Sequence, residues 1–153
     1  MRPISQAVLE KSVKGKRILI DTNIIIYLTD GIHPYASLSR RLFEMIESGD
    51  VFAYFSMISI AEVMQGPLRR GLKRNAMEVR DYILNFPNAA CQEINLDVLE
   101  RIGSDQQIDW VKLRTSDSLI IASGLTNSVD RIVSNDDHFR QAIPRHLFLS
   151  FTS

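Results

Sequence analysis

Several features that assign a sequence to a familiar class are scarce in this chain of 153 residues. It has one cysteine, Cys91, so it cannot form an internal disulfide or a zinc site built from cysteines. No apolar run exceeds five residues, as at Ile24 to Leu28, whereas a membrane-spanning helix needs about 20. The first fifteen residues lack the apolar stretch of a secretory signal. We therefore expect a reducing, cytoplasmic setting and no membrane.

An excess of charge of one sign is also absent, because 18 basic residues balance 18 acidic ones. No overall basic field marks a nucleic-acid binder, although a local basic patch can coexist with local acidic ligands. The seven glycines form no GxGxxG or GxxxxGK[ST] pattern, and the three histidines lack the spacing of a helical two-histidine metal site. These absences exclude the common phosphate-binding loops and zinc motifs. The sequence also shows no Ser-His-Asp or Cys-His motif for nucleophilic catalysis.

What the chain does contain is an alternation of apolar, β-branched segments with segments of helical periodicity. Strands are expected over residues 17–21, 51–56, 90–94, 131–134 and 146–149. Helices are expected over residues 34–48, 59–67, 69–85, 97–108 and 116–125, with a short turn at 136–139. Such alternation predicts an α/β fold with a parallel sheet flanked by helices. The length favours one domain, which we divide into an arm, 1–15, and a body, 16–153.

Four acidic residues occupy similar places in this pattern. Asp21 ends the first strand, Asp136 follows the strand at 131–134, Asp117 lies at the start of a helix, and Glu62 completes a Ser-x-x-Glu helix start with Ser59. Each alone has an ordinary structural interpretation, because a carboxylate in the first turn of a helix is stabilised by about 0.3–1 kcal/mol. As a set they are harder to explain, because the carboxyl ends of parallel strands gather at one edge of the sheet, where ligands bind.

Four carboxylates at one edge would repel each other unless a cation held them. Two unit charges ~4 Å apart repel by about 4 kcal/mol at an effective dielectric constant of 20. Mg²⁺ and Mn²⁺ prefer hard oxygen ligands and keep waters for chemistry. A bound divalent ion lowers the pKa of water and neutralises the charge of a phosphodiester. The pattern therefore favours a Mg²⁺ or Mn²⁺ site that hydrolyses phosphodiester bonds.

The same residues fall into four ordered motifs. An apolar-Asp-Thr-Asn motif ends at Asn23, a glutamate precedes a glycine by four positions at Glu62, an Asp-x-Leu-Ile-x-Ala motif begins at Asp117, and Ser-x-Asp with a phenylalanine three positions later is centred on Asp136. In these motifs the chain resembles the PIN domain family, and within it the VapC-like toxins. The resemblance covers residues 17–149, and Asn135 stands where the family frequently has arginine.

That resemblance implies a three-layer α/β/α sandwich around a mostly parallel sheet of about five strands. It implies an endoribonuclease that hydrolyses RNA with metal-activated water, leaving a 5′-phosphate and a 3′-hydroxyl, and that is the toxin of a toxin–antitoxin pair. A cognate antitoxin and a homodimer are the implied protein partners. By analogy the catalytic acids are Asp21, Glu62, Asp117 and Asp136, the metal ligands are Asp21, Asp117 and Asp136, and the supporting residues are Asn23 and Ser134.

Two other functions fit parts of the sequence. A nonenzymatic RNA- or partner-binding module on the same scaffold would retain the acids as helix caps alone. An aspartyl phosphatase of the haloacid dehalogenase type needs a second aspartate two residues after Asp21, and Asn23 occupies that place. A run of basic residues downstream of Glu62 would either contact phosphates or form a solvated helix face: Arg69, Arg70, Lys73 and Arg74.

Overall fold

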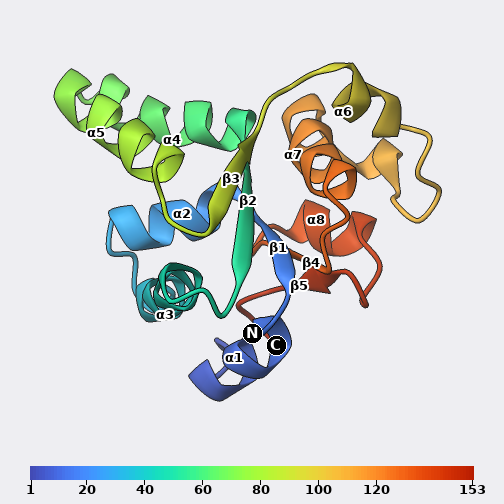
Figure 1. The fold of residues 1–153 in the computed structure, drawn as a ribbon, viewed down its shortest axis with the longest axis horizontal. Coiled ribbons are helices and arrows are strands. Elements are labelled where there is room, and N and C mark those ends of the chain that lie inside the picture. The colour runs from blue at the N-terminus through green and yellow to red at the C-terminus, as the bar shows by residue number, and fades with distance from the viewer.

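Five strands form one sheet in the order β3-β2-β1-β4-β5, and every neighbouring pair is parallel (Figure 1). The computed structural model describes residues 1 to 153. The strands are β1 (Arg17–Ile20), β2 (Phe52–Ser56), β3 (Ala89–Gln92), β4 (Arg131–Val133) and β5 (Phe148–Leu149). The expected α/β class and the number of strands are confirmed, and the sheet is parallel throughout.

Helices connect the strands and cover the sheet. They are α1 (Gln6–Val13), α2 (Thr22–Thr29), α3 (Ala36–Glu47), α4 (Met57–Arg69), α5 (Lys73–Leu84), α6 (Leu96–Arg101), α7 (Thr115–Thr126) and α8 (Asp137–Ala142), with a 3₁₀ turn, η1, over Trp110–Lys112. No helix combines the length and the hydropathy that a membrane span requires.

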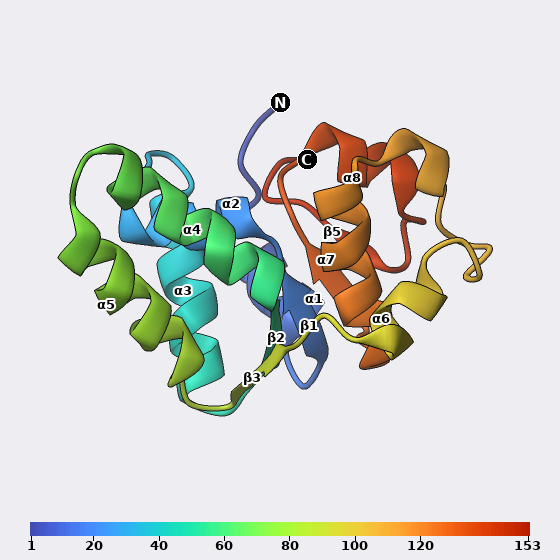
Figure 2. The ribbon, with the colours of Figure 1, turned by 90° about the horizontal axis from the view of Figure 1, so that it is seen from above.

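Alternate side chains of the central strands are buried in two separate hydrophobic cores, one on each face of the sheet. On β1, Ile18 and Ile20 belong to the larger core and Leu19 to the smaller one, as expected where successive side chains point to opposite faces of a sheet. Side chains from α1 to α5 fill the first core, and those from α7 and α8 fill the second. Figure 2 shows α2–α5 and α6–α8 on opposite sides of the strands. The layers are therefore α/β/α, the predicted sandwich.

Helix α3 illustrates how the apolar periodicity sets the packing. Its apolar face, formed by Leu38, Leu42, Met45 and Ile46, is buried in the larger core. Gly49 follows with φ of +86°, a left-handed conformation that glycine adopts without strain and that ends helices.

The N-terminal segment is tied to this core. Leu9 and Val13 of α1 are fully buried among the side chains of the larger core. Upstream of the helix, the Ile4 amide donates to the carbonyl of Phe151 at 2.8 Å, and Pro3 pairs with Thr152. Residues 1–15 thus contain a helix that packs on α3 and lie beside the C-terminal end of the chain.

Three expected element boundaries are wrong. The helix expected from Ser59 begins two residues earlier, at Met57, because β2 runs directly into it and the Ser56 side chain caps it. The helix expected over 97–108 ends at Arg101, near Gly103, whose φ is +84°. The turn expected at 136–139 is the start of α8, which extends to Ala142.

Candidate active site

Two neighbouring strands end at the same place and bring their next residues together. Ile20 of β1 pairs with Val133 of β4, and the Asp21 amide donates to the Val133 carbonyl at 3.0 Å. Immediately beyond this pair, the Ser134 hydroxyl donates to Oδ2 of Asp21 at 2.6 Å. The carboxyl end of the sheet therefore holds a buried serine–aspartate pair, at the edge where ligands bind in parallel α/β sheets.

Asp21 is almost completely buried, with 5% of its surface exposed. Its side chain caps α2 by accepting a hydrogen bond from the Thr22 amide at 2.7 Å. Burial is the largest cause that raises the pKa of Asp21, and the negative charges of Asp136 and Glu62 also raise it, whereas the bonds from Ser134 and Thr22 lower it; the net result is a pKa of about 7. The carboxylate is thus held in a site that penalises its charge, a penalty that a bound cation would relieve.

Glu62 lies in the same pocket but is not a helix cap. It is the sixth residue of α4, whose N-cap is Ser56, with the Ser56 hydroxyl accepting from the Ile58 amide at 3.2 Å. The capping-box interpretation with Ser59 is wrong, and the Ser59 hydroxyl is buried without a hydrogen-bond partner. Glu62 instead accepts a 2.6 Å hydrogen bond from the hydroxyl of Thr22, the first residue of α2.

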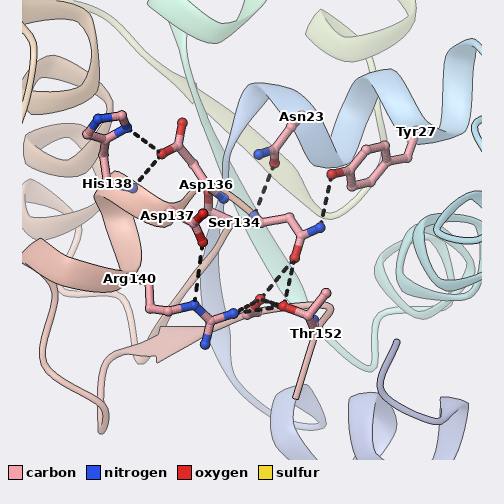
Figure 3. A network of polar contacts seen from close by, with 10 residues as sticks. Asn23, Tyr27, Ser134, Asp136, Asp137, His138, Arg140 and Thr152 are labelled. Atoms are coloured by element: carbon pink, nitrogen blue, oxygen red, sulfur yellow. Dashed lines mark hydrogen bonds and ion pairs between the residues drawn. The ribbon is translucent and has the colours of Figure 1, made fainter. Parts of the chain in front are cut away.

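Asp136 is both an N-cap and a neighbour of the buried pair. Its Oδ1 accepts from the His138 amide at 2.7 Å and lies 3.2 Å from Nδ1 of the same histidine (Figure 3). Its own amide donates to the Ser134 hydroxyl at 3.1 Å. Ser134 therefore connects the turn that carries Asp136 to Asp21, and the structure brings three of the expected acids, Asp21, Glu62 and Asp136, into one charged neighbourhood.

Asp117 stands somewhat apart. It lies in the first turn of α7 and is 6% exposed. Its ion-pair partner is Arg114, at 3.4 Å between Nε and Oδ2, and no hydrogen bond or ion pair joins it to another of the four acids. Helix α7 packs on β1, β2 and α4, the elements that carry or precede Asp21 and Glu62. The fold thus places Asp117 on a neighbouring helix without a direct polar contact to the other acids.

A polar network behind the pocket was missed by sequence reasoning. The Asn135 amide nitrogen donates to the Tyr27 hydroxyl at 3.1 Å, and its Oδ1 accepts from the Ser150 hydroxyl at 2.9 Å (Figure 3). Arg140 donates to Ser150 at 2.8 Å and to Thr152 at 2.7 Å. The network ties the Asp136 turn to α2 and to the last residues of the chain.

The two expected supporting residues lie at this junction. Ser134 bonds to Asp21 as described, and the Asn23 side chain accepts from the Asn135 backbone amide at 3.4 Å. Thr22 was not among the expected site residues, although its place between Asp21 and Asn23 in the first motif was the available signal. Nothing in the sequence pointed to Ser150 or Arg140.

The donor chemistry of the pocket fits a hard divalent ion. Asp21, Glu62 and Asp136 offer carboxylate oxygens, and their mutual repulsion adds to the raised pKa of Asp21. No group of three or more His, Cys, Asp or Glu side chains is placed so that it could hold a metal ion by itself. Mg²⁺ does not require one, because it is commonly bound through one or two carboxylates plus waters and substrate phosphates.

Comparison with known proteins identifies a family that the chain matches. A PIN domain family model matches residues 18–143 of the chain. Structures of similar fold include VapBC2 from Rickettsia felis bound to a DNA fragment from their promoter, with a TM-score of 0.66 and 18% identity over 88% of this chain and 98% of that one. No curated protein matches the sequence.

Two further structures have the same fold. VapC20 from Mycobacterium tuberculosis, a Sarcin-Ricin loop cleaving toxin, has a TM-score of 0.60 and 16% identity over 81% of this chain and 93% of that one. DNA-bound VapBC from Salmonella typhimurium has a TM-score of 0.64 and 13% identity over 89% of this chain and 98% of that one. At these identities the neighbours establish the fold.

Proposed function

Because the chain belongs to the PIN domain family, we propose that it is a Mg²⁺- or Mn²⁺-dependent endoribonuclease. The observation that carries the proposal is the buried carboxylate of Asp21, whose pKa is raised to about 7 by burial and by the neighbouring Asp136 and Glu62. An isolated helix cap gains nothing from such a setting, whereas a metal ligand does. The similarity to a Sarcin-Ricin loop cleaving toxin supports a nuclease function for this fold.

The chain's own residues would hold the ion and the reactants in place. Asp21, Asp117 and Asp136 would be the metal ligands, with Asp136 binding either directly or through water. When bound, the ion would lower the pKa of a water molecule and offset the charge of the phosphodiester. Glu62, held by Thr22, would bind the ion or orient the attacking water. Ser134 and Asn23 would keep the carboxylates in position through their hydrogen bonds. The expected products carry a 5′-phosphate and a 3′-hydroxyl.

An RNA cleavage assay with purified protein tests this function directly. We expect cleavage of RNA with Mg²⁺ or Mn²⁺ and loss of cleavage in Asp21→Asn and Asp117→Asn. Asp130→Asn is a matched control, because Asp130 accepts from the Arg17 amide at the start of β1, outside the pocket. Robust cleavage by both site variants would reject the assigned residues. Correctly folded protein that binds no metal in isothermal titration would favour the nonenzymatic binding module.

The proposed biological role is the toxin of a toxin–antitoxin pair acting in the cytoplasm. The support is the set of neighbours crystallised as VapBC complexes from Rickettsia felis and Salmonella typhimurium. On this proposal the chain forms a homodimer and is inhibited by a cognate antitoxin. Co-expression with the product of the adjacent reading frame should suppress toxicity and RNA cleavage, and co-purification should recover a complex.

A further inference from the structure

A cavity of about 490 Å³ opens between α2, α4 and α5, the helices grouped on one side of Figure 2. Glu62 forms part of its wall, so the cavity adjoins the acidic pocket. Its size lies within the range of small-molecule sites, about 300–1,000 Å³. Apart from Glu62, its wall residues have no place in the proposed catalytic set, and the cavity is therefore available for another part of the substrate.

The wall offers an aromatic surface beside apolar side chains. Ile26, Val63 and Val79 line it together with Tyr82. Tyr82 is 46% exposed, and its ring is held by an edge contact with Phe86, with centroids 5.3 Å apart and planes at 67°. The ring of a half-exposed tyrosine fixed in this way can stack against a nucleobase, as aromatic residues do in proteins that bind single-stranded RNA.

The polar part of the wall presents two opposite charges without partners of their own. Asp30 accepts a hydrogen bond from the Thr29 hydroxyl at 3.2 Å and has no cationic partner. Arg70 lies over Gly66 and forms no ion pair. Glu78, which also lines the cavity, is paired with Arg74 at 3.3 Å.

Charge balance then decides between a basic ligand and a neutral one. Glu62 already accepts the Thr22 hydrogen bond and belongs to the metal pocket. Glu78 is neutralised by its ion pair with Arg74. The negative charge of Asp30 and the positive charge of Arg70 then offset each other. The cavity suits a flat, neutral ligand that has hydrogen-bond donors on one edge and acceptors on another.

Guanine meets this requirement most fully among the RNA bases. Its N1–H and N2–H₂ groups are donors for a carboxylate, and its O6 and N7 atoms form the edge that arginine contacts through two hydrogen bonds. Uracil and cytosine have no N7, and adenine carries an amino group in place of O6. We propose that the cavity binds a guanine base of the RNA substrate, with Tyr82 stacking on the ring, Asp30 accepting from N1 and N2, and Arg70 donating to O6 and N7. This subsite rests on the proposed ribonuclease function.

Guanosine 5′-monophosphate is a suitable probe because it contains no phosphodiester bond to cleave. We expect titration of ¹⁵N-labelled protein in Mg²⁺ to shift the amide signals of Asp30, Arg70 and Tyr82. Uridine 5′-monophosphate should bind about tenfold more weakly. Inosine 5′-monophosphate should fall between the two, because it lacks the N2 amino group.

Variants assign the contacts within the cavity. Asp30→Asn, Arg70→Ala and Tyr82→Leu should each weaken binding of guanosine monophosphate by about tenfold. Arg69→Ala is the matched control, since Arg69 is an exposed arginine of the same helix end that does not line the cavity. Tyr82→Phe keeps the ring and should retain the affinity. Thermal denaturation of each variant establishes that it is folded.

Equal affinity for guanosine and uridine monophosphates, or signal shifts confined to other residues, would overturn the subsite. So would an arginine-containing peptide whose binding is lost in Asp30→Asn while nucleotide binding is unaffected, because the occupant would then be a segment of a partner protein. Failure of the ribonuclease function has a different signature. In that case the wild type cleaves no RNA with Mg²⁺ or Mn²⁺, and the cavity still prefers guanosine monophosphate.

Discussion

The hydroxyl of Ser134 donates to Oδ2 of Asp21 across 2.6 Å and so joins the ends of two neighbouring parallel strands. The same hydroxyl accepts from the amide of Asp136 at 3.1 Å. Its bond to Asp21, like the bond from the Thr22 amide, opposes the burial that raises the pKa of Asp21. Ser134 therefore both sets the geometry of the acidic pocket and favours the ionised carboxylate that a metal ion requires.

Replacing Ser134 with alanine should shift the pH dependence of the proposed RNA cleavage to higher pH. A hydrogen bond to a charged group contributes about 1.5–3 kcal/mol, which corresponds to roughly one to two pKa units. Without that bond the pKa of Asp21 rises above 7. The pH at which cleavage in Mg²⁺ reaches half its maximum should therefore be about one unit higher than in the wild type. Rates measured between pH 6 and 9 test the shift.

Ser123→Ala is the control for the loss of a buried serine. The Ser123 hydroxyl bonds to Ser56 and to the Leu119 carbonyl, so its removal should change stability but leave the pH profile in place. A Ser134→Ala profile that superimposes on that of the wild type would show that the hydroxyl does not tune Asp21.

Asp21→Asn should remove a pH-dependent loss of stability from the metal-free protein. The folded pKa of about 7 lies above 3.8, the ordinary pKa of an aspartate. The unfolded chain therefore ionises first, and folding is penalised progressively as the pH rises from about 4 to about 7. The full penalty, present above pH 7, is roughly 4 kcal/mol. Urea denaturation in EDTA should give a steeper decline across this window for the wild type than for Asp21→Asn. Parallel curves would contradict the raised pKa.

Metal binding should release protons near neutral pH. Asp21 must be ionised to bind a metal ion, and with a pKa of about 7 roughly half of the molecules are protonated at pH 7. Isothermal titration with Mn²⁺ in two buffers of different ionisation enthalpy should report release of about half a proton at pH 7 and almost none at pH 9. Equal release at both pH values would exclude Asp21 as the group that loses the proton.

Thr22→Val should weaken metal-dependent cleavage while leaving the fold intact. The variant keeps the shape and the backbone N–H that bonds to Asp21 but loses the hydroxyl that donates to Glu62 at 2.6 Å. Loss of a residue that orients a ligand typically costs 10–100-fold in metal affinity or activity. The expected result is a tenfold or greater rise in the Mg²⁺ concentration that gives half-maximal cleavage. Thr126→Val, which loses a hydroxyl bonded only within α7, should behave as the wild type.

The strand ends and the first helix cap were predictable because their signals are local. Asp21 follows a run of apolar residues, and its carboxylate caps the next helix by accepting a hydrogen bond from the amide of its neighbour, Thr22. The start of α4 could not be predicted in this way, because Ser56 and Ser59 both suit an N-cap and the choice between them depends on where β2 ends. That shift matters for function, since it removes the capping explanation for Glu62.

The network around Asn135 was unpredictable for a different reason. Its side-chain partners Tyr27 and Ser150 lie 108 and 15 residues away in the sequence, and they meet only because the parallel sheet aligns its carboxyl ends. The order of the motifs suggested Asp117 as one of four site acids, which stays a prediction. Its Arg114 partner could not be foreseen, because that ion pair depends on how α7 begins.

Asn135→Ala should destabilise the protein and disturb the turn that carries Asp136. The change removes the donor to the half-buried Tyr27 hydroxyl and the acceptor for the buried Ser150 hydroxyl, which keeps its bonds with Arg140 and Thr152. Leaving a buried polar group without its partner costs about 1–3 kcal/mol, so the free energy of unfolding should fall by that amount. Tyr27→Phe removes only one of the two bonds and should cost less than Asn135→Ala. Urea denaturation and the cleavage rate of both variants provide the measurement. An unfolding free energy equal to that of the wild type in Asn135→Ala would mean that the network does not hold the turn against α2 and the chain end.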